Sequence, residues 1–336
     1  MSQHIRTLKE GYWDRTTVVR AVDGNLRVRK ESRATVNPGP WAHAALRNEI
    51  TFLNAFRENH KIPLPTLLDC WDAETIGYEI PFFEDRVDVA RSLLTGEFKQ
   101  DAADDMQSEL CMAIFDGLHR SQLLQDDHFA VHVQKIIRES IITLGGEERF
   151  HALTSGPQVR INGQKIPSLA ASLSLLEEQS LFEKLGATPD VLLHGDLILE
   201  NILWAPLLLI DPVSVAGLTS GHPLFDLVKY ESYARGELYA IREELVSAGP
   251  VAAGFNFQID WEHTDLAPFR RLDLCAVFRE GYLRTYHDLD HSLYSLIDAY
   301  FSLVMARNTT GTHQWARVLN GCQSLAAAAG ELDPKL

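Results

Sequence analysis

Three polar side chains interrupt an otherwise apolar stretch between Val191 and Val213. Asp196 and Asn201 follow the apolar run 191–193, two further apolar runs occupy residues 202–203 and 207–210, and Asp211 closes the last of them. Such runs predict short buried strands, so we expect the three side chains to meet at one strand edge. Their oxygens suit a hard cation such as Mg²⁺, which takes its remaining ligands from water and phosphates. Phosphoryl transfer needs such a set, with one acid left to accept the proton of the attacking hydroxyl.

Each of these residues also has a purely structural interpretation. An aspartate before a buried strand is often a turn former or a helix cap, and a lone His-x-Asp also occurs as half of a metallohydrolase site. The order and spacing of Asp196, Asn201 and Asp211 favour the chemical interpretation for the set. For Asp226, which stands alone, the structural interpretation is preferred.

The segment 194–201, HGDLILEN, has the spacing of the protein-kinase catalytic loop but carries Gly195 where protein kinases have arginine. In this form it resembles the aminoglycoside phosphotransferase and choline kinase family of small-molecule kinases. Two further motifs of that family follow in order, Ile-Asp-Pro at residues 210–212 and Gly-x-Pro-x-x-Asp-Leu at residues 221–227. The chain departs from many relatives at Ile198, where they carry histidine.

The resemblance implies an α+β fold of the protein-kinase-like, bilobal kind. Residues 1–81 would form a β-rich nucleotide-binding lobe with one key helix, and residues 82–336 a larger, mostly helical catalytic and acceptor-binding lobe, with the hinge near residues 80–85. The implied enzyme is a kinase that moves the γ-phosphate of ATP or GTP, with Mg²⁺, to a hydroxyl. The acceptor would be an aminoglycoside or other antibiotic, or a related hydroxylated metabolite.

The same resemblance assigns roles to the polar residues. Asp196 would be the catalytic base, while Asn201 and Asp211 would bind Mg²⁺. His194 and Asp226 would support the catalytic loop, Asp226 through hydrogen bonds to its backbone.

A lysine on a predicted strand is the candidate for phosphate binding. Strands over residues 16–21 and 26–30 are joined by a turn of the sequence Asp-Gly-Asn, and strand alternation places Lys30 on the buried face. A buried lysine needs an anionic partner. In kinase-like lobes the corresponding lysine holds nucleotide phosphates and pairs with a helix glutamate. The alternative is a strand-end cation that reaches solvent.

The partner glutamate and the hinge are assigned by resemblance. A helical apolar stripe over residues 42–58 carries Glu49, which resembles the paired glutamate of the family, although a solvated helix face is the alternative. The run 75–84 predicts a strand that enters an extended connector, where Pro81, Phe82 and Phe83 would bind the nucleotide base. Two aromatics in an apolar strand are also common in a plain core.

A loop that opens at Gly11 lies where a phosphate cover is expected, but it lacks the several glycines of a good cradle. Its role is left open, with Thr16 and Thr17 as alternative phosphate contacts.

The remainder is expected to be mostly helical. The sequence predicts a helix from Asp101, a hairpin over residues 159–166, one helix over residues 169–185, and helices from residue 226 to the C-terminus. Three acids in the last region are candidates for acceptor binding, although each alone is more commonly solvated surface: Asp260, Glu262 and Asp265.

Composition narrows the class of protein. The chain has 336 residues, of which 46% are hydrophobic and 23% charged, which is ordinary for a globular protein with two lobes. It lacks an apolar leader and any apolar run long enough to span a membrane, so a cytoplasmic location is expected. The four cysteines are scattered without metal-ligand spacing, so they are expected to be reduced thiols.

The net charge of −15 argues against a nucleic-acid partner, because an acidic surface repels phosphate backbones. It would attract a cationic acceptor, although an acidic surface that serves only solubility is an equal alternative.

Two other classes of function remain as alternatives. One is a nucleotide-binding, pseudokinase-like regulator, which is disfavoured because the chain keeps the base Asp196. The other is a metabolite kinase of the choline, amino alcohol, homoserine or sugar type. A protein kinase is disfavoured because no Ala-Pro-Glu segment follows Asp211.

Overall fold

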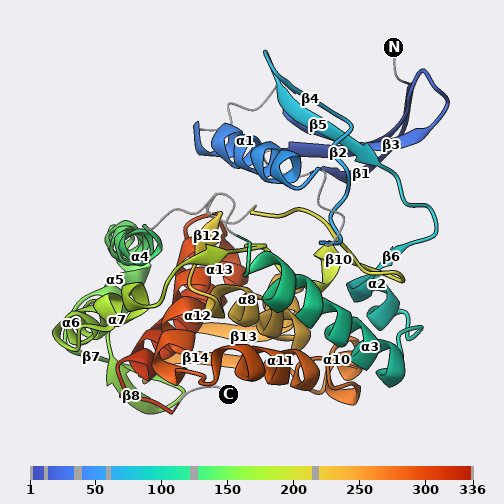
Figure 1. Cartoon of the computed structure of the whole chain (residues 1–336). Coiled ribbons are helices and arrows are strands. Elements are labelled where there is room, and N and C mark those ends of the chain that lie inside the picture. Colours follow the sequence, from blue (N-terminus) through green and yellow to red (C-terminus); the bar gives the residue numbers. More distant parts are fainter. Residues whose placement is uncertain are drawn as a thin grey trace. The chain divides into compact units, whose positions relative to one another are not determined.

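The structure is a computed structural model that describes residues 3–10, 14–33, 40–57, 62–121, 128–213 and 219–333. The chain divides into two compact units. The first consists of residues 1–98, 108–125 and 191–220, and the second of residues 99–107, 126–190 and 221–336. The predicted α+β class is confirmed, since sheet dominates the N-terminal region and helices dominate the C-terminal part (Figure 1).

A five-stranded antiparallel sheet, in the order β1-β2-β3-β5-β4, forms the first part of unit one. Its strands are β1 (Gln3–Glu10), β2 (Asp14–Arg20), β3 (Leu26–Ser32), β4 (Asp69–Asp72) and β5 (Ile76–Pro81). The predicted strands 16–21 and 26–30 correspond to β2 and β3, whereas β1 was not predicted because all its residues are exposed and carry no apolar alternation. The register places Lys30 of β3 opposite Tyr78 of β5.

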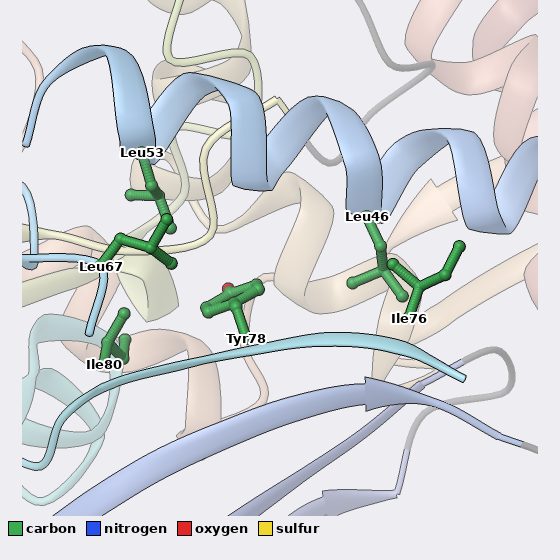
Figure 2. Packing of buried hydrophobic residues seen from close by; sticks show 6 residues of the cluster. All are labelled: Leu46, Leu53, Leu67, Ile76, Tyr78 and Ile80. Carbon is green, nitrogen blue, oxygen red and sulfur yellow. The ribbon is translucent and has the colours of Figure 1, made fainter. Parts of the chain in front are cut away.

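Helix α1 (Pro40–Ala55) packs on one face of this sheet (Figure 1). Figure 2 shows Leu46 and Leu53 of α1 pointing towards three alternate residues of β5, with Leu67 beside them. The six buried members are Leu46, Leu53, Leu67, Ile76, Tyr78 and Ile80, none more than 7% exposed. Burying each aliphatic side chain contributes roughly 1.5–3 kcal/mol. This packing fixes the helix that carries Glu49 against β5, the neighbour of the strand that carries Lys30.

The rest of unit one carries the first two of the three family motifs. Its elements are β6 (Val87–Asp88), α2 (Val89–Leu94), the π-helix η1 (Met112–Leu118), β9 (Val191–Leu192), the 3₁₀ turn η3 (Leu199–Asn201), β10 (Ile202–Trp204), β11 (Leu208–Leu209) and β12 (Ser220–Gly221). Strands β11, β10 and β6 form a small sheet, and β9 pairs with β12. The predicted pair of short buried strands is therefore confirmed as β10 and β11.

The second unit is mostly helical. Helix α3 (Gln100–Cys111) begins in it and ends in unit one. The other helices are α4 (Phe129–Gly145), η2 (Glu148–Phe150), α5 (His151–Thr154), α6 (Leu169–Glu178), α7 (Leu181–Ala187), α8 (Leu224–Ala234), α9 (Glu237–Arg242), η4 (Thr264–Leu266), α10 (Ala267–Arg271), α11 (Ala276–Tyr286), α12 (His291–Ala306) and α13 (Gly311–Ala328). Aromatic side chains lie in the core of this unit. The ring centroids of Phe225 on α8 and Phe301 on α12 are 4.6 Å apart.

Two predictions for this unit are wrong. The single helix expected over residues 169–185 is two helices, because Ser180 adopts a left-handed conformation (φ 54°) that ends α6 and precedes α7. Helices do not fill the region after residue 226, since β13 (Val246–Val251) and β14 (Gly254–Ile259) form a hairpin there. That hairpin completes a sheet in the order β13-β14-β7-β8.

Strands β7 (Gln158–Ile161) and β8 (Gln164–Pro167) confirm the predicted hairpin over residues 159–166. Its turn has two residues with positive φ, Asn162 and Gly163, as a type I′ connection requires. Within the described residues, no helix is long and apolar enough to cross a membrane.

Candidate active site

Lys30 is the centre of a buried charge cluster in unit one. Strand alternation turns its side chain to the α1 side of the sheet, where the residue is only 5% exposed. Its Nζ atom lies 2.9 Å from Oε1 of Glu49, 3.3 Å from Oδ1 of Asp211 and 3.8 Å from Oδ2 of Asp14. The predicted pair of Lys30 and Glu49 is thus formed, and the alternative of a solvent-directed lysine is excluded.

The three acids keep the lysine charged. Burial alone lowers the pKa of Lys30, but the carboxylates of Asp211 and Glu49 outweigh that effect and hold the pKa well above its ordinary value. For Glu49, burial dominates over the attraction of Lys30 and raises its pKa to about 7. The ion pair is therefore complete only above neutral pH.

Tyr78 is a further member of the cluster that the sequence reasoning missed. Its hydroxyl donates to Oε1 of Glu49 at 2.9 Å, the same oxygen that accepts from Lys30. Burial, followed by the charge of Glu49, raises the pKa of Tyr78 well above its ordinary value, so the hydroxyl keeps its proton. Strand alternation over residues 76–80 was the available signal, because it places Tyr78 on the face that carries Lys30 in the neighbouring strand.

Asp196 and Asn201 are held together within the catalytic loop. The Nδ2 atom of Asn201 donates to the backbone oxygen of Asp196 at 2.9 Å and to its Oδ2 at 3.0 Å. A left-handed Gly195 (φ 82°) precedes the aspartate, a conformation that glycine adopts without steric cost. Asp196 is half-buried and Asn201 is buried. This arrangement fixes the orientation of the Asp196 carboxylate and directs only the amide nitrogen of Asn201 to it.

The loop that carries Asp211 is fastened to the catalytic loop through backbone hydrogen bonds. Ile210 N donates to Asn201 O at 3.0 Å, and Val213 N donates to the carbonyl of the fully buried His194 at 2.5 Å. Asp211 and Val213 both have positive φ, 53° and 51°. Such backbone conformations are costly for a β-branched residue and concentrate at functional sites.

These residues fit a Mg²⁺ ion. Among the described residues no group of three or more His, Cys, Asp or Glu side chains forms a metal cluster. A magnesium ion that takes one carboxylate and one amide oxygen from the protein does not need such a cluster, because water and nucleotide phosphates supply the other ligands. Asp211, and Asn201 through its amide oxygen, are the residues that would hold it.

The predicted hinge residues lie at the end of β5, whose last residue is Pro81, and directly after it. Pro81, Phe82 and Phe83 are each half-buried, and Phe82 N donates to Leu26 O at 3.3 Å. Arginine guanidinium groups lie over both rings, 5.4 Å from the centroid of Phe82 and 4.9 Å from that of Phe83. The rings are therefore not closed within an apolar core.

The other predicted residues lie in unit two or outside the described residues. Asp226 is fully buried in the first turn of α8, and its support of the catalytic loop stays a prediction. Asp260, Glu262 and Asp265 are all exposed, and Glu262 pairs with Arg270 at 3.2 Å. The loop at Gly11 lies outside the described residues.

One glycine of the family motifs has a clear packing role. Gly221 lies so close to the ring of Phe129 that a β-carbon at this position would overlap it. Any larger residue would displace the ring.

A family model described as the phosphotransferase enzyme family matches residues 4–249. The chain belongs to this phosphotransferase family. It is accordingly a kinase, and the cluster around Lys30, Glu49 and Asp211 lies within the matched region. No sequence among the curated proteins matches the chain significantly.

Solved structures similar to this family member show the same fold. A protein from Thermobifida fusca designated a fructosamine-3-kinase has a TM-score of 0.57 and 14% identity, over 98% of this chain and 93% of that chain. The ternary complex of APH(2″)-IIa with streptomycin and ATP has a TM-score of 0.52 and 11% identity, over 97% and 93%. The GDP complex of aminoglycoside 2′-phosphotransferase-IIIa has a TM-score of 0.52 and 14% identity, over 98% and 93%.

Proposed function

We propose that the enzyme moves the γ-phosphate of ATP or GTP to a hydroxyl of an aminoglycoside or other antibiotic, or of a related hydroxylated metabolite, with Mg²⁺. The observation that carries this proposal is the contact of Lys30 with both Glu49 and Asp211. It joins the residue suited to phosphate binding to the residue suited to metal binding, on a loop bonded to the one that holds Asp196.

The residues of the site have distinct tasks in the proposed reaction. Lys30, held by Glu49, binds nucleotide phosphates as a fixed positive charge. Mg²⁺ held by Asn201 and Asp211 would neutralise charge on the phosphate oxygens. The Asp196 carboxylate orients the acceptor hydroxyl and takes its proton as the oxygen attacks the γ-phosphorus, and the nucleoside diphosphate leaves. Asn201 keeps that carboxylate in one orientation through Oδ2.

The acceptor class is supported by the relatives and by charge. The neighbours with the same fold include proteins in complex with ATP, GDP or streptomycin and one designated a fructosamine-3-kinase. Streptomycin and fructosamines both carry amines beside hydroxyls. The net charge of −15 favours a cationic acceptor.

A nucleotide-consumption screen tests the proposal. The acceptors should include aminoglycosides, nucleoside antibiotics, fructosamines, choline and other amino alcohols, homoserine and sugars, each with ATP and with GTP. We expect one class to stimulate consumption above the acceptor-free rate, and the Asp196→Asn variant to abolish the increase. Nucleotide binding without consumption for any acceptor would favour the regulator instead.

A further inference from the structure

A pocket of about 490 Å³ in unit two is lined by three arginines. It lies among the start of α3, the end of α8, α10 and the loop before α11. The arginines are Arg235, Arg270 and Arg271, and Asp273 is the one acidic residue among its described lining residues. None of the residues assigned above to catalysis, metal or nucleotide lines this pocket.

Arg235 is fixed in the pocket wall by a buried charge cluster. Glu231 is fully buried and accepts from Arg279 Nε at 2.8 Å, from Arg279 Nη2 at 2.6 Å and from the hydroxyl of Tyr294 at 2.8 Å. Arg235 donates to the same Tyr294 hydroxyl at 2.9 Å, and its Nη1 lies 3.5 Å from Glu231. Two guanidinium groups thus share one fully buried carboxylate.

A second acid compensates the charge of Arg235 only weakly, because it is farther away and partly exposed to water. That acid is Glu237, whose carboxylate lies 3.8 Å from Arg235 Nη2 and is partly exposed to water. The Nε and Nη1 atoms of Arg235 are buried and find no hydrogen-bond acceptor among the described residues. These two atoms are closed to solvent, so only the exposed remainder of the Arg235 side chain, 22% of its surface, faces the pocket, where an oxyanion is the natural partner of a guanidinium.

The charged residues at the pocket rim also favour an anionic ligand. Arg270 pairs with Glu262 at 3.2 Å, but Arg271 has no ion pair among the described residues. The acid Asp273 is already engaged, because its Oδ1 accepts from Cys275 N at 3.0 Å and from Ala276 N at 2.9 Å at the start of α11. The lining therefore offers more positive than negative charge to a ligand.

The pocket wall is held rigid by side chains from α3. The carbonyl of Asp273 accepts from Gln100 Nε2 and Gln107 Nε2, both at 3.1 Å, and Asp273 N donates to Gln100 Oε1 at 3.0 Å. The next carbonyl, of Leu274, accepts from the buried Tyr230 hydroxyl at 2.6 Å. A wall fastened in this way needs little ordering when a ligand binds.

We propose that this pocket binds a small anion, a phosphate- or carboxylate-bearing metabolite, with Arg235 and Arg271 as its ligands. The anionic group belongs either to the phosphate acceptor of the enzyme or to a separate regulator. The binding itself does not rest on the proposed function.

Calorimetric titration of the whole protein with inorganic phosphate tests the site without turnover. Arg271→Gln removes an exposed charge at the rim and leaves the fold untouched. Arg235→Lys keeps the charge beside Glu231 but loses the donor fork. Arg284→Gln removes an exposed arginine of α11 outside the pocket and is the matched control. We expect both pocket variants to weaken phosphate binding by about threefold or more, and the control to leave it unchanged.

The absence of saturable phosphate binding in the wild-type protein overturns the proposal, and so does an equal loss in the Arg284→Gln control. If Arg235→Lys binds phosphate with unchanged affinity, Arg235 is not a ligand, and the proposed pair of Arg235 and Arg271 is wrong. Once an acceptor is known, phosphate that raises the acceptor KM alone identifies the acceptor as the source, and phosphate that changes kcat at saturating acceptor identifies a regulator.

Discussion

The Nζ atom of Lys30 lies 3.3 Å from Oδ1 of Asp211, although the two residues belong to distant parts of the sequence. The lysine suited to phosphate binding thereby neutralises the carboxylate suited to metal binding. A nucleotide with its cation would replace this contact by two others, lysine to phosphate and carboxylate to metal. The pair keeps both charges compensated until that exchange.

Asp211→Ala should abolish turnover by removing the carboxylate ligand. We expect kcat to fall by at least about 10²-fold, since the residue acts on charge that develops in the transition state. The fold should persist, because Lys30 retains its contact with Glu49. The measurement is steady-state kinetics across Mg²⁺ concentrations, with thermal unfolding as the check on folding. Asp105→Ala, an exposed acid of α3, is the control; near wild-type transfer by Asp211→Ala would show that the metal assignment is wrong.

Asp196→Asn keeps the shape of the side chain but cannot accept a proton. General base catalysis contributes about 10²- to 10⁴-fold, so kcat should fall within that range. The dissociation constant of the nucleotide should change little, because the assigned partner of Asp196 is the acceptor hydroxyl. Both quantities need measurement. An unchanged kcat removes Asp196 as the base, and a loss of nucleotide affinity would instead assign it to the metal.

Tyr78→Phe should move the pH dependence of nucleotide binding. Glu49 has a pKa raised to about 7, so the carboxylate that holds Lys30 is lost as pH falls through that value. The Tyr78 hydroxyl bonds the ionised form and lowers this pKa, so its removal should shift the loss of affinity to higher pH. The nucleotide dissociation constant, measured from pH 6 to about 9, reports the shift.

Tyr300→Phe is the matched control, because it removes a buried hydroxyl that contacts His132 at 3.1 Å in unit two. If both variants keep the wild-type pH profile, Tyr78 has only a packing role.

The same raised pKa of Glu49 has a consequence for stability. Protonated Glu49 contributes to the free energy of unfolding because the folded state binds its proton more tightly than the unfolded state does. This contribution is fully present below the ordinary pKa of 4.5 and is lost as pH rises through about 7.

The sequence was informative where local patterns determine structure. The hairpin of β2 and β3, the inward side of Lys30 and the short strands around Asp196 and Asp211 all follow from alternation and turn residues. The break between α6 and α7 could not be predicted in this way. It depends on one serine in a left-handed conformation, which no local preference indicates.

Contacts between distant segments of the chain also could not be predicted from local sequence patterns. The pairing of Lys30 with Glu49 was assigned only by resemblance, and the third partner Tyr78 was missed, because helix position relative to a sheet is set by side-chain packing. The hairpin of β13 and β14 had a partial sequence signal that was missed. In β14 the apolar Phe255, Phe257 and Ile259 alternate with polar residues, whereas β13 contains Gly249 and Pro250 and shows no such alternation.

Glu231→Ala should destabilise unit two. The substitution leaves Arg279 and Arg235 without their shared carboxylate, and breaking a buried ion pair in this way costs about 3–5 kcal/mol. Chemical unfolding of the variant measures the loss. Glu183→Ala, in which an exposed glutamate of α7 is removed, should cost little. A small effect of Glu231→Ala would mean that the two arginines find other partners.

The salt dependence of the acceptor KM should reveal the charge of the acceptor. Exposed charges are screened within about 8 Å at physiological ionic strength, so the KM of a cationic acceptor attracted by surface acids rises with salt. Asp260→Lys and Asp265→Lys should raise it further and leave the nucleotide KM unchanged. Asp105→Lys is the control for nonspecific charge. A flat salt response and no effect of these reversals would instead indicate a neutral acceptor bound through hydrogen bonds.

Glu262→Lys separates the remaining alternatives by the sign of its effect. The glutamate is exposed and pairs with Arg270, which lines the arginine pocket. A cationic acceptor that contacts this acid loses an attraction, so its KM should rise. An acceptor with an anionic group in the pocket gains a cation and a freed Arg270, so its KM should fall. The KM of the nucleotide, with acceptor saturating, should not change in either case. Because the two expected shifts have opposite signs, one variant measured at low and at physiological salt decides between a cationic and an anionic acceptor.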